Sequence, residues 1–150
     1  MALRPGIPMR MAPRAKPHGH FLAAEAGELA GVSGNTIGQW ARRGYIRSSQ
    51  SSGEPRIYSV EDVAEAVIVR ALLERGVGHA QVRRAIERLS CYGDWPLSEA
   101  PLATTAGAGR PLIVLREEDG SYALSPRGWQ RMAAPPRLRD VRLRLRRTRG

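Results

Sequence analysis

Side chains that can contact nucleic acid gather in one short stretch of this sequence, residues 33–58. The stretch holds four arginines and a single acid, while the twelve residues before it hold two glutamates. Guanidinium groups pair with phosphates and base edges, and hydroxyl and amide side chains form hydrogen bonds at the same places. Gln39 and Arg43 suit contacts to bases. Thr36 and Arg42 suit contacts to phosphates. The candidate contact residues are Ser33, Asn35, Thr36, Gln39, Arg42, Arg43, Arg47, Arg56 and Tyr58.

Two short helices joined by a tight turn would present these side chains. Apolar and small residues recur at helical spacing over residues 22–30 and predict the first helix. The run stops at Gly31, which favours a turn. Ser33 or Asn35 can cap a second helix, and Gly44 ends it. The inward face of this second helix is predicted to hold Ile37, Trp40 and Ala41.

A flexible hairpin is predicted directly after the second helix. Residues 45–47 and 56–58 are two short β-prone pieces, and the polar residues 48–55 connect them. Serine, glycine and proline in this connection are typical of a hairpin tip. The order of helix, turn, helix and basic hairpin predicts a winged helix-turn-helix, in which the second helix enters the major groove of DNA.

Two further helices are predicted beyond the hairpin. Ser59 and Asp62 have the spacing of a capping box, and the apolar pattern behind them indicates a third helix to about Arg75. Residues 82–89 indicate a fourth helix, which residues 92–96 end with glycine and proline. The fourth helix is therefore too short for a dimerising coiled coil.

The last third of the chain indicates β-structure. Residues 111–116 and 121–124 predict a hairpin that turns at residues 118–120, after a loop of small residues over 103–109. From residue 138 onward, leucine and valine alternate with arginine or aspartate, which predicts a strand with one apolar and one basic face. A disordered basic tail is the alternative.

The net charge of +10 is distributed unevenly along the chain. It amounts to +4 over residues 1–20, +1 over 21–90, −1 over 91–136 and +6 over 137–150. We expect these segments to be a disordered basic tail, the winged helix-turn-helix domain, a small β-hairpin element, and a basic strand or tail. The predicted fold class is α+β, a mainly helical winged helix-turn-helix domain followed by a small β-hairpin or strand extension.

Several short motifs follow one another along residues 21–89: Val32-Ser33, Trp40-Ala-Arg-Arg-Gly44, Arg56-Ile-Tyr-Ser-Val-Glu-Asp-Val63, Leu73-Glu-Arg-Gly-Val77 and Val82-Arg-Arg-Ala-Ile86. In this order they resemble the MerR family of winged-helix regulators. The resemblance implies that Trp40 packs in the core, that Arg43 and Arg56 touch the DNA backbone, and that Tyr58 braces the wing or reaches a phosphate. After Leu89 the chain departs from these regulators, because their long dimerisation helix is missing.

A second, weaker resemblance concerns the C-terminal part of the chain. From Arg70 through residues 94–97 to Leu112 and Tyr122, the pattern is similar to the VapB-type antitoxins, which pair with PIN-like toxins. It implies a toxin partner, whose acidic surface the basic C-terminal segment would contact. The same arginines would otherwise extend the contact with DNA. The partner-binding candidates are Arg142, Arg144, Arg146 and Arg147.

The sequence offers little support for catalytic, metal-binding or membrane functions. It has no nucleophile paired with a histidine, no carboxylate pair on a shared scaffold, and no glycine-rich phosphate loop, so we expect no enzyme. Cys91 is the single cysteine, and no cysteine and histidine cluster has zinc spacing, so we expect neither a metal nor a cofactor. No apolar run approaches the roughly 18 residues that span a bilayer, and no secretory signal begins the chain. We expect a cytoplasmic protein with no membrane contact.

The predicted function is sequence-specific binding of double-stranded DNA by a bacterial transcriptional regulator that works as a homodimer. The antitoxin resemblance extends this prediction to the autoregulating antitoxin of a type II toxin-antitoxin pair. Two alternatives remain open at this point. One is an architectural DNA-binding protein similar to an excisionase, and the other is a protein-binding adaptor that does not bind DNA.

Overall fold

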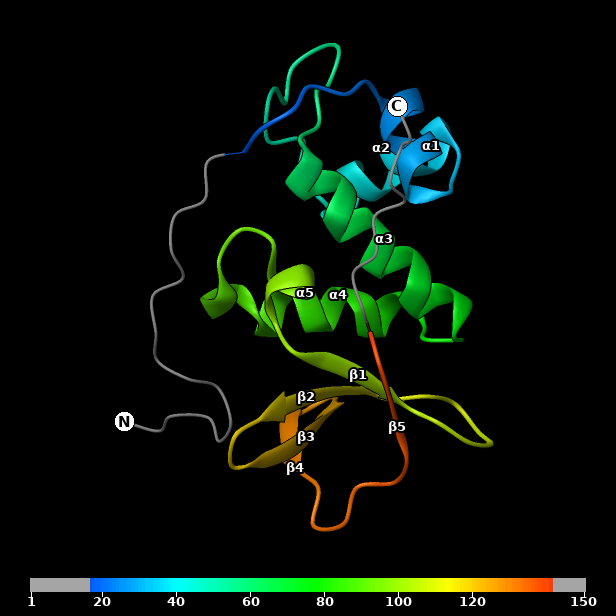
Figure 1. Ribbon diagram of the computed structural model, residues 1–150, viewed down its shortest axis with the longest axis vertical. Helices are drawn as coiled ribbons and strands as arrows, with labels where there is room; N and C mark the ends of the chain where they lie inside the picture. Colours follow the sequence, from blue (N-terminus) through cyan, green and yellow to red (C-terminus); the bar gives the residue numbers. More distant parts are fainter. Residues whose placement is uncertain (1–16, 142–150) are drawn as a thin grey trace. The chain divides into compact units, whose positions relative to one another are not determined.

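A computed structural model describes residues 17–141 of the chain (Figure 1). The described residues divide into two compact units, residues 17–70 and residues 71–141. We call them the N-terminal unit and the sheet unit, and describe each by itself. Helix α3 (Val60–Glu74) contains the boundary between them. No helix of the described range is both long and apolar enough to cross a membrane.

The N-terminal unit begins with two short helices, α1 (Ala23–Ala30) and α2 (Gly34–Arg42). The Glu25 carboxylate accepts the backbone N–H of Leu22 at 2.9 Å, which satisfies a free donor where α1 starts. Gly31 ends α1 in the left-handed conformation at φ 84°, and Ser33 caps α2. Both predicted helices and the predicted turn are confirmed.

The wing differs in one arm from the predicted hairpin. Residues 45–47 form no strand; the backbone N–H of Tyr45 instead donates to Trp40 O at 2.8 Å, which continues the end of α2 and buries Tyr45. The arm is formed further along, where Ser51 pairs with Ile57 in an isolated antiparallel bridge. A second bridge joins Tyr58 to Phe21, a residue before α1. The β-propensity of residues 45–47 therefore reflects burial and not strand pairing.

Helix α3 begins as predicted, with a capping box. The backbone N–H of Ser59 donates to Asp62 Oδ2 at 2.8 Å, and the backbone N–H of Asp62 donates to Ser59 Oγ at 3.1 Å. Both residues are fully buried. The buried apolar side chains of the N-terminal unit include Ile37, Trp40, Tyr45, Ile46, Val63 and Ile68.

The sheet unit holds five antiparallel strands in the order β4-β3-β2-β1-β5. The predicted hairpin is confirmed as β2 (Ile113–Glu117) and β3 (Gly120–Ser125). The expected small-residue loop over 103–109 is partly wrong, because β1 (Leu102–Thr105) covers its start, and β4 (Gly128–Arg131) was not expected. Ala103 and Gly128 have low strand propensity, and pairing with β2 and β3 makes these segments strands.

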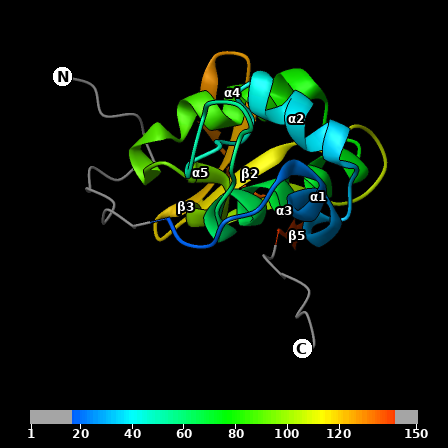
Figure 2. The same cartoon turned by 90° about the horizontal axis from the view of Figure 1, so that it is seen from above.

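Helices cover one face of this sheet. α4 (His79–Arg88) and α5 (Pro96–Glu99), with a short 3-10 turn at Ser90–Tyr92, lie over the strands (Figure 1; Figure 2). The register places Leu102, Leu115 and Tyr122 side by side on neighbouring strands, and all three are buried. The Gln81 side chain of α4 accepts the backbone N–H of Ile113 at 3.2 Å.

The fifth strand, β5 (Leu138–Asp140), starts where the alternating pattern predicted a strand. Arg142, Arg144, Arg146 and Arg147, the candidates for partner binding, lie outside the described residues. The predicted N-terminal tail also lies outside them as far as residue 16.

Candidate nucleic-acid interface

Glycines allow the backbones of α1 and α2 to approach each other closely. A Cβ atom added at Gly27 would lie 2.6 Å from Val32 O, and one added at Gly34 would lie 3.1 Å from Ala24 Cα. The Arg70 guanidinium donates to Ala30 O at 3.3 Å, where the C-terminal end of α1 has free carbonyl groups. This packing fixes the direction in which α2 projects from the unit.

Gly27 provides a direct test of this close approach. In Gly27→Ala the new methyl group meets backbone, which cannot turn aside, and we expect the free energy of unfolding to fall by about 1–3 kcal/mol. Gly38→Ala is the matched control, because its methyl group would meet only the mobile end of Arg42 at 3.4 Å. Alanine there should raise the free energy of unfolding by roughly 0.5–1 kcal/mol, since it favours helix. Urea unfolding measures both, and equal effects would contradict the packing argument.

One side of α2 carries an uncovered polar stripe. Asn35, Gln39 and Arg42 are exposed and are spaced four and three residues apart, so they lie on the same side of the helix. Ile37 and Trp40 point into the core, with exposures of 0% and 5%. Arg43 follows directly as the exposed C-cap residue. An exposed amide and guanidinium stripe of this kind can form hydrogen bonds with base edges and phosphates.

Ser33 and Thr36 have a structural part in α2. The backbone N–H of Thr36 donates to Ser33 Oγ at 3.0 Å, and the two hydroxyl oxygens also lie 3.0 Å apart. Ser33 thus caps the helix and is exposed beside it. A hydroxyl group in such a cap still has a lone pair for an incoming donor, but its main role is to stabilise the start of the helix.

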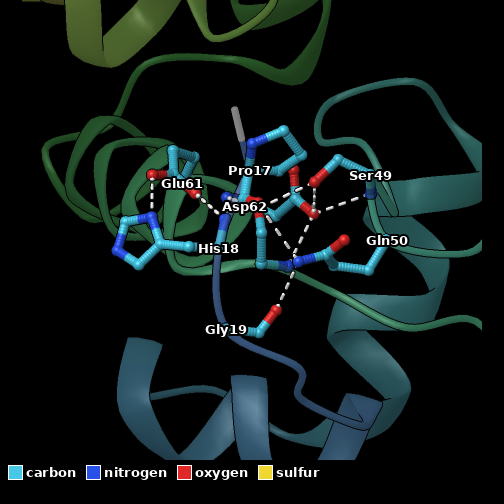
Figure 3. Close-up of polar contacts among 8 residues, drawn as sticks. Pro17, His18, Gly19, Ser49, Gln50, Glu61 and Asp62 are labelled. Atoms are coloured by element: carbon cyan, nitrogen blue, oxygen red, sulfur yellow. Dashed lines mark hydrogen bonds and ion pairs between the residues drawn. The ribbon is translucent and has the colours of Figure 1, made fainter. Parts of the chain in front are cut away.

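A buried carboxylate holds the root of the wing to the start of α3 (Figure 3). Asp62 Oδ2 accepts the backbone N–H of Ser49 at 2.8 Å, the Ser49 hydroxyl at 2.6 Å and the backbone N–H of Ser59 at 2.8 Å. Ser49 Oγ lies 2.7 Å from Ser59 Oγ. The hydrogen bonds come from both ends of the wing, so Asp62 closes the loop that the wing forms.

The segment before α1 braces the wing from the other side. We call residues 17–21 the strap. Gln50 Nε2 donates to Gly19 O at 2.7 Å, and the backbone N–H of His18 donates to Glu61 Oε1 at 3.0 Å (Figure 3). His18 Nδ1 lies 2.5 Å from Glu61 Oε2. The strap therefore joins the wing to the first turn of α3.

Tyr58 lies between basic side chains of α2 and the wing. Burial raises the pKa of its phenol above the ordinary value of 10.0, Arg56 and Arg42 lower it, and Asp62 raises it further. Tyr58 is only 1% exposed, so of its two predicted roles the structure favours bracing the wing. Arg42 of α2 and Arg56 of the wing thus both influence the Tyr58 phenol, one from each element.

The raised pKa of Tyr58 has a consequence for stability at high pH. The unfolded chain ionises this phenol at a lower pH than the folded chain, so stability from the neutral form is complete below pH 10.0 and is lost as the pH rises above it. We expect the gap in free energy of unfolding between the wild type and Tyr58→Phe to shift in favour of the variant between about pH 9 and about pH 11. Urea unfolding across this range measures it. Parallel decline of both proteins would contradict the assigned cause.

Of the nine predicted contact residues, six lie on α2 or at its caps and three lie in the wing. Arg47 is exposed at the start of the wing, and it already interacts with another group of the protein. Arg42, Arg43 and Arg56 have no acidic partner among the residues that the structure describes. The sequence analysis missed Asp62 as the wing's anchor; the only sequence signal for Asp62 is the capping-box spacing. It also missed Gln50 and the strap. Among residues 17–141, no three histidine, cysteine or acidic side chains come together as a metal site would require.

Comparison with known proteins agrees with this geometry. Residues 22–89 match the family described as MerR HTH family regulatory protein. An HTH-type transcriptional regulator of Mycobacterium tuberculosis (strain H37Rv), Rv1830, is 32% identical over 86 residues, which cover 55% of this chain and 38% of the relative. Mb1861 of Mycobacterium bovis has the same identity and coverage, and both carry the description uncharacterized. No solved structure matches the chain.

Residues 22–89 are therefore a MerR-family helix-turn-helix domain, the kind of domain that DNA-binding transcriptional regulators carry. The chain spans 38% of the length of the curated relatives it matches. The comparisons give no support to the antitoxin resemblance of the C-terminal part.

Proposed function

We propose that the chain binds double-stranded DNA in a sequence-specific manner and regulates transcription. The observation that carries the proposal is the exposed stripe of α2, Asn35, Gln39 and Arg42, on a helix whose other side is buried in a MerR-type domain. A helix with this arrangement places side chains in the major groove. The names of the relatives, HTH-type transcriptional regulators, support the same class.

Separate side chains would read bases and hold phosphates. Gln39 and Arg43 are proposed to contact bases, because amide and guanidinium groups make paired hydrogen bonds with adenine and guanine. Arg42 and Arg56 are proposed to contact the phosphates, where a cation fixes position without reading sequence. Asn35, Thr36 and Arg47 complete the predicted surface, while Ser33 and Tyr58 act mainly by holding α2 and the wing in place.

Selection of DNA sites from a randomised duplex pool tests this assignment. The wild type should enrich one motif, and Gln39→Ala should relax the preference at one base pair, at a cost of about 1–3 kcal/mol for that contact. Arg42→Ala should weaken binding to all sequences alike. A pool that stays random with the wild type would count against sequence-specific binding.

We further propose that two copies bind a palindromic site in the cytoplasm of a bacterial cell. Two-fold symmetry in the protein corresponds to two-fold symmetry in the site, and half-sites lie one helical turn apart. Light scattering of the free and DNA-bound protein measures the number of copies. Bending of the DNA is measured from the gel mobility of complexes in which the selected site is placed at varied positions in a longer duplex. An architectural protein would bend the site, whereas a simple regulator need not.

The antitoxin role is a finer proposal that rests on the C-terminal resemblance alone. Its test is co-purification of the full chain with the product of the neighbouring gene, with and without residues 137–150. Retention that depends on this segment would support a toxin partner. Failure to bind would leave the regulator without that role.

A further inference from the structure

The sheet unit contains a cavity that the DNA-binding surface does not use. It is open to solvent, has a volume of about 470 Å³ and is lined by Ala106, Gly107, Arg137 and Arg139. Ala106 and Gly107 belong to the loop between β1 and β2, Arg139 belongs to β5, and Arg137 directly precedes β5; the loop and the strand lie side by side in Figure 1. Cavities of this size hold small organic ligands.

The backbone around the cavity is well defined on both sides. The backbone N–H of Ala106 donates to Arg137 O at 2.9 Å, so the loop is tied to the strand segment at this point. Thr104 pairs with Arg139 in the register of β1 and β5. Arg139 lies in β5 and Arg137 directly precedes it, and both arginines line the cavity. The loop glycine Gly107 has φ 113°, and a Cβ atom added there would meet no atom within 4 Å.

The two arginines carry positive charge that no described acid neutralises. Asp140, the acid nearest to them in the sequence, forms an ion pair with Arg116. Neither Arg137 nor Arg139 has an acidic partner within residues 17–141. A ligand with negative charge would supply the missing counter-charge.

A third arginine adds to the positive field. Arg75 donates to Thr104 Oγ1 at 3.0 Å and to Arg139 O at 3.1 Å, so its guanidinium is held close to β5. Burial lowers the pKa of Arg75, the charge of Arg139 lowers it further, and Asp140 raises it. Like charges thus stand close together at this edge of the sheet, and an anion would relieve their repulsion.

The walls of the cavity are mostly apolar. Among the lining residues, Ala106 has a methyl group and the two arginines have methylene stems that can supply apolar surface. Arginine side chains lie along apolar surface with their stems and keep the charged head at the rim. We propose that this cavity binds a small organic anion, in which an apolar body fills the cavity and a phosphate or carboxylate group pairs with Arg137 and Arg139. The inference does not depend on DNA binding, because every residue it uses lies in the sheet unit.

Nuclear magnetic resonance titration of the full chain tests the site, with benzyl phosphate as the probe. Its phosphate supplies the anion and its ring supplies the apolar body. We expect saturable shifts of the Ala106, Gly107 and Leu138 amides. Inorganic phosphate, which lacks the ring, and benzyl alcohol, which lacks the phosphate, should both bind more weakly. Benzoate, compared with benzyl phosphate, distinguishes a carboxylate ligand from a phosphate ligand. Absence of saturable shifts at these amides with both anions would overturn the proposal.

Two variants separate the charge from the cavity. Arg137→Met combined with Arg139→Met keeps the aliphatic stems and removes the charges. This double variant should lower the affinity for benzyl phosphate at least about ten-fold. Ala106→Phe fills the cavity and leaves the charges in place, and it should lower the affinity for the same probe. Arg127→Met is the control, because this exposed arginine lies in the turn before β4 and not at the cavity. Equal affinity of all variants, or equal losses in the control, would show that the probe binds elsewhere and would overturn the assignment.

Discussion

Replacing Asp62 by alanine should destabilise the protein more than any other single change at the candidate interface. The substitution removes an acceptor of three hydrogen bonds and leaves the backbone N–H groups of Ser49 and Ser59 without it. Because Asp62 is fully buried, water cannot replace it without rearrangement. We expect the free energy of unfolding to fall by about 2–4 kcal/mol, from the lost cap and the lost wing anchor together.

Two matched variants make the Asp62 experiment specific. Glu61→Ala changes the neighbouring, partly exposed acid and removes its pairing with His18, and it should cost no more than about 1 kcal/mol. Asp62→Asn keeps one accepting oxygen and should fall between the two. Urea unfolding gives the free energies, and amide hydrogen exchange at Ser49 and Ser51 reports the wing. If Asp62→Ala unfolded like Glu61→Ala, the proposed anchor would be wrong.

Removing Arg42 and Arg56 together should weaken DNA binding strongly without unfolding the protein. Both are without an acidic partner among the described residues, and both lower the pKa of the Tyr58 phenol between α2 and the wing. If each neutralises one phosphate, Arg42→Gln with Arg56→Gln should lower the slope of log affinity against log salt by about 1.8. The affinity loss should be roughly 10- to 100-fold. Fluorescence anisotropy over a salt series measures both quantities.

The control for this pair is Arg127→Gln, which removes a charge from an exposed turn of the sheet unit. It should leave the salt slope unchanged. The free energy of unfolding should stay within about 0.5 kcal/mol of the wild type in the double variant, since neither arginine pairs with a described acid. A double variant that kept the wild-type slope would show that these arginines do not touch phosphates.

Local sequence signals were sufficient for the helices of the interface. Gly31 ends α1 and Ser33 caps α2, both through backbone geometry that depends on the residue itself. Ile37 and Trp40 were predicted as core because of their helical spacing, and they are buried. The polar stripe follows from the same periodicity, since residues on the opposite side of the helix remain exposed.

Features that depend on distant partners were not predictable in the same way. Asp62 reads as a helix cap, but its contact with Ser49 exists only once the wing folds back. The arm of the wing pairs at Ser51 and not at residues 45–47, because burial of Tyr45 against the end of α2 competes with strand pairing. β1 and β4 are strands because they pair with β2 and β3, and neither four-residue segment has the alternation of apolar and polar residues that predicts a strand.

Binding of the wild type to the DNA upstream of its own coding region tests the central claim most directly. A duplex of that region and a shuffled duplex of the same composition are compared by fluorescence anisotropy over a salt series. The account predicts that the natural duplex binds at least about a thousand-fold more tightly, with affinity that falls steeply as salt increases. Selection from a random pool would supply the site if the protein regulates other genes instead. Equal affinity for natural, selected and shuffled duplexes would contradict sequence-specific recognition by α2.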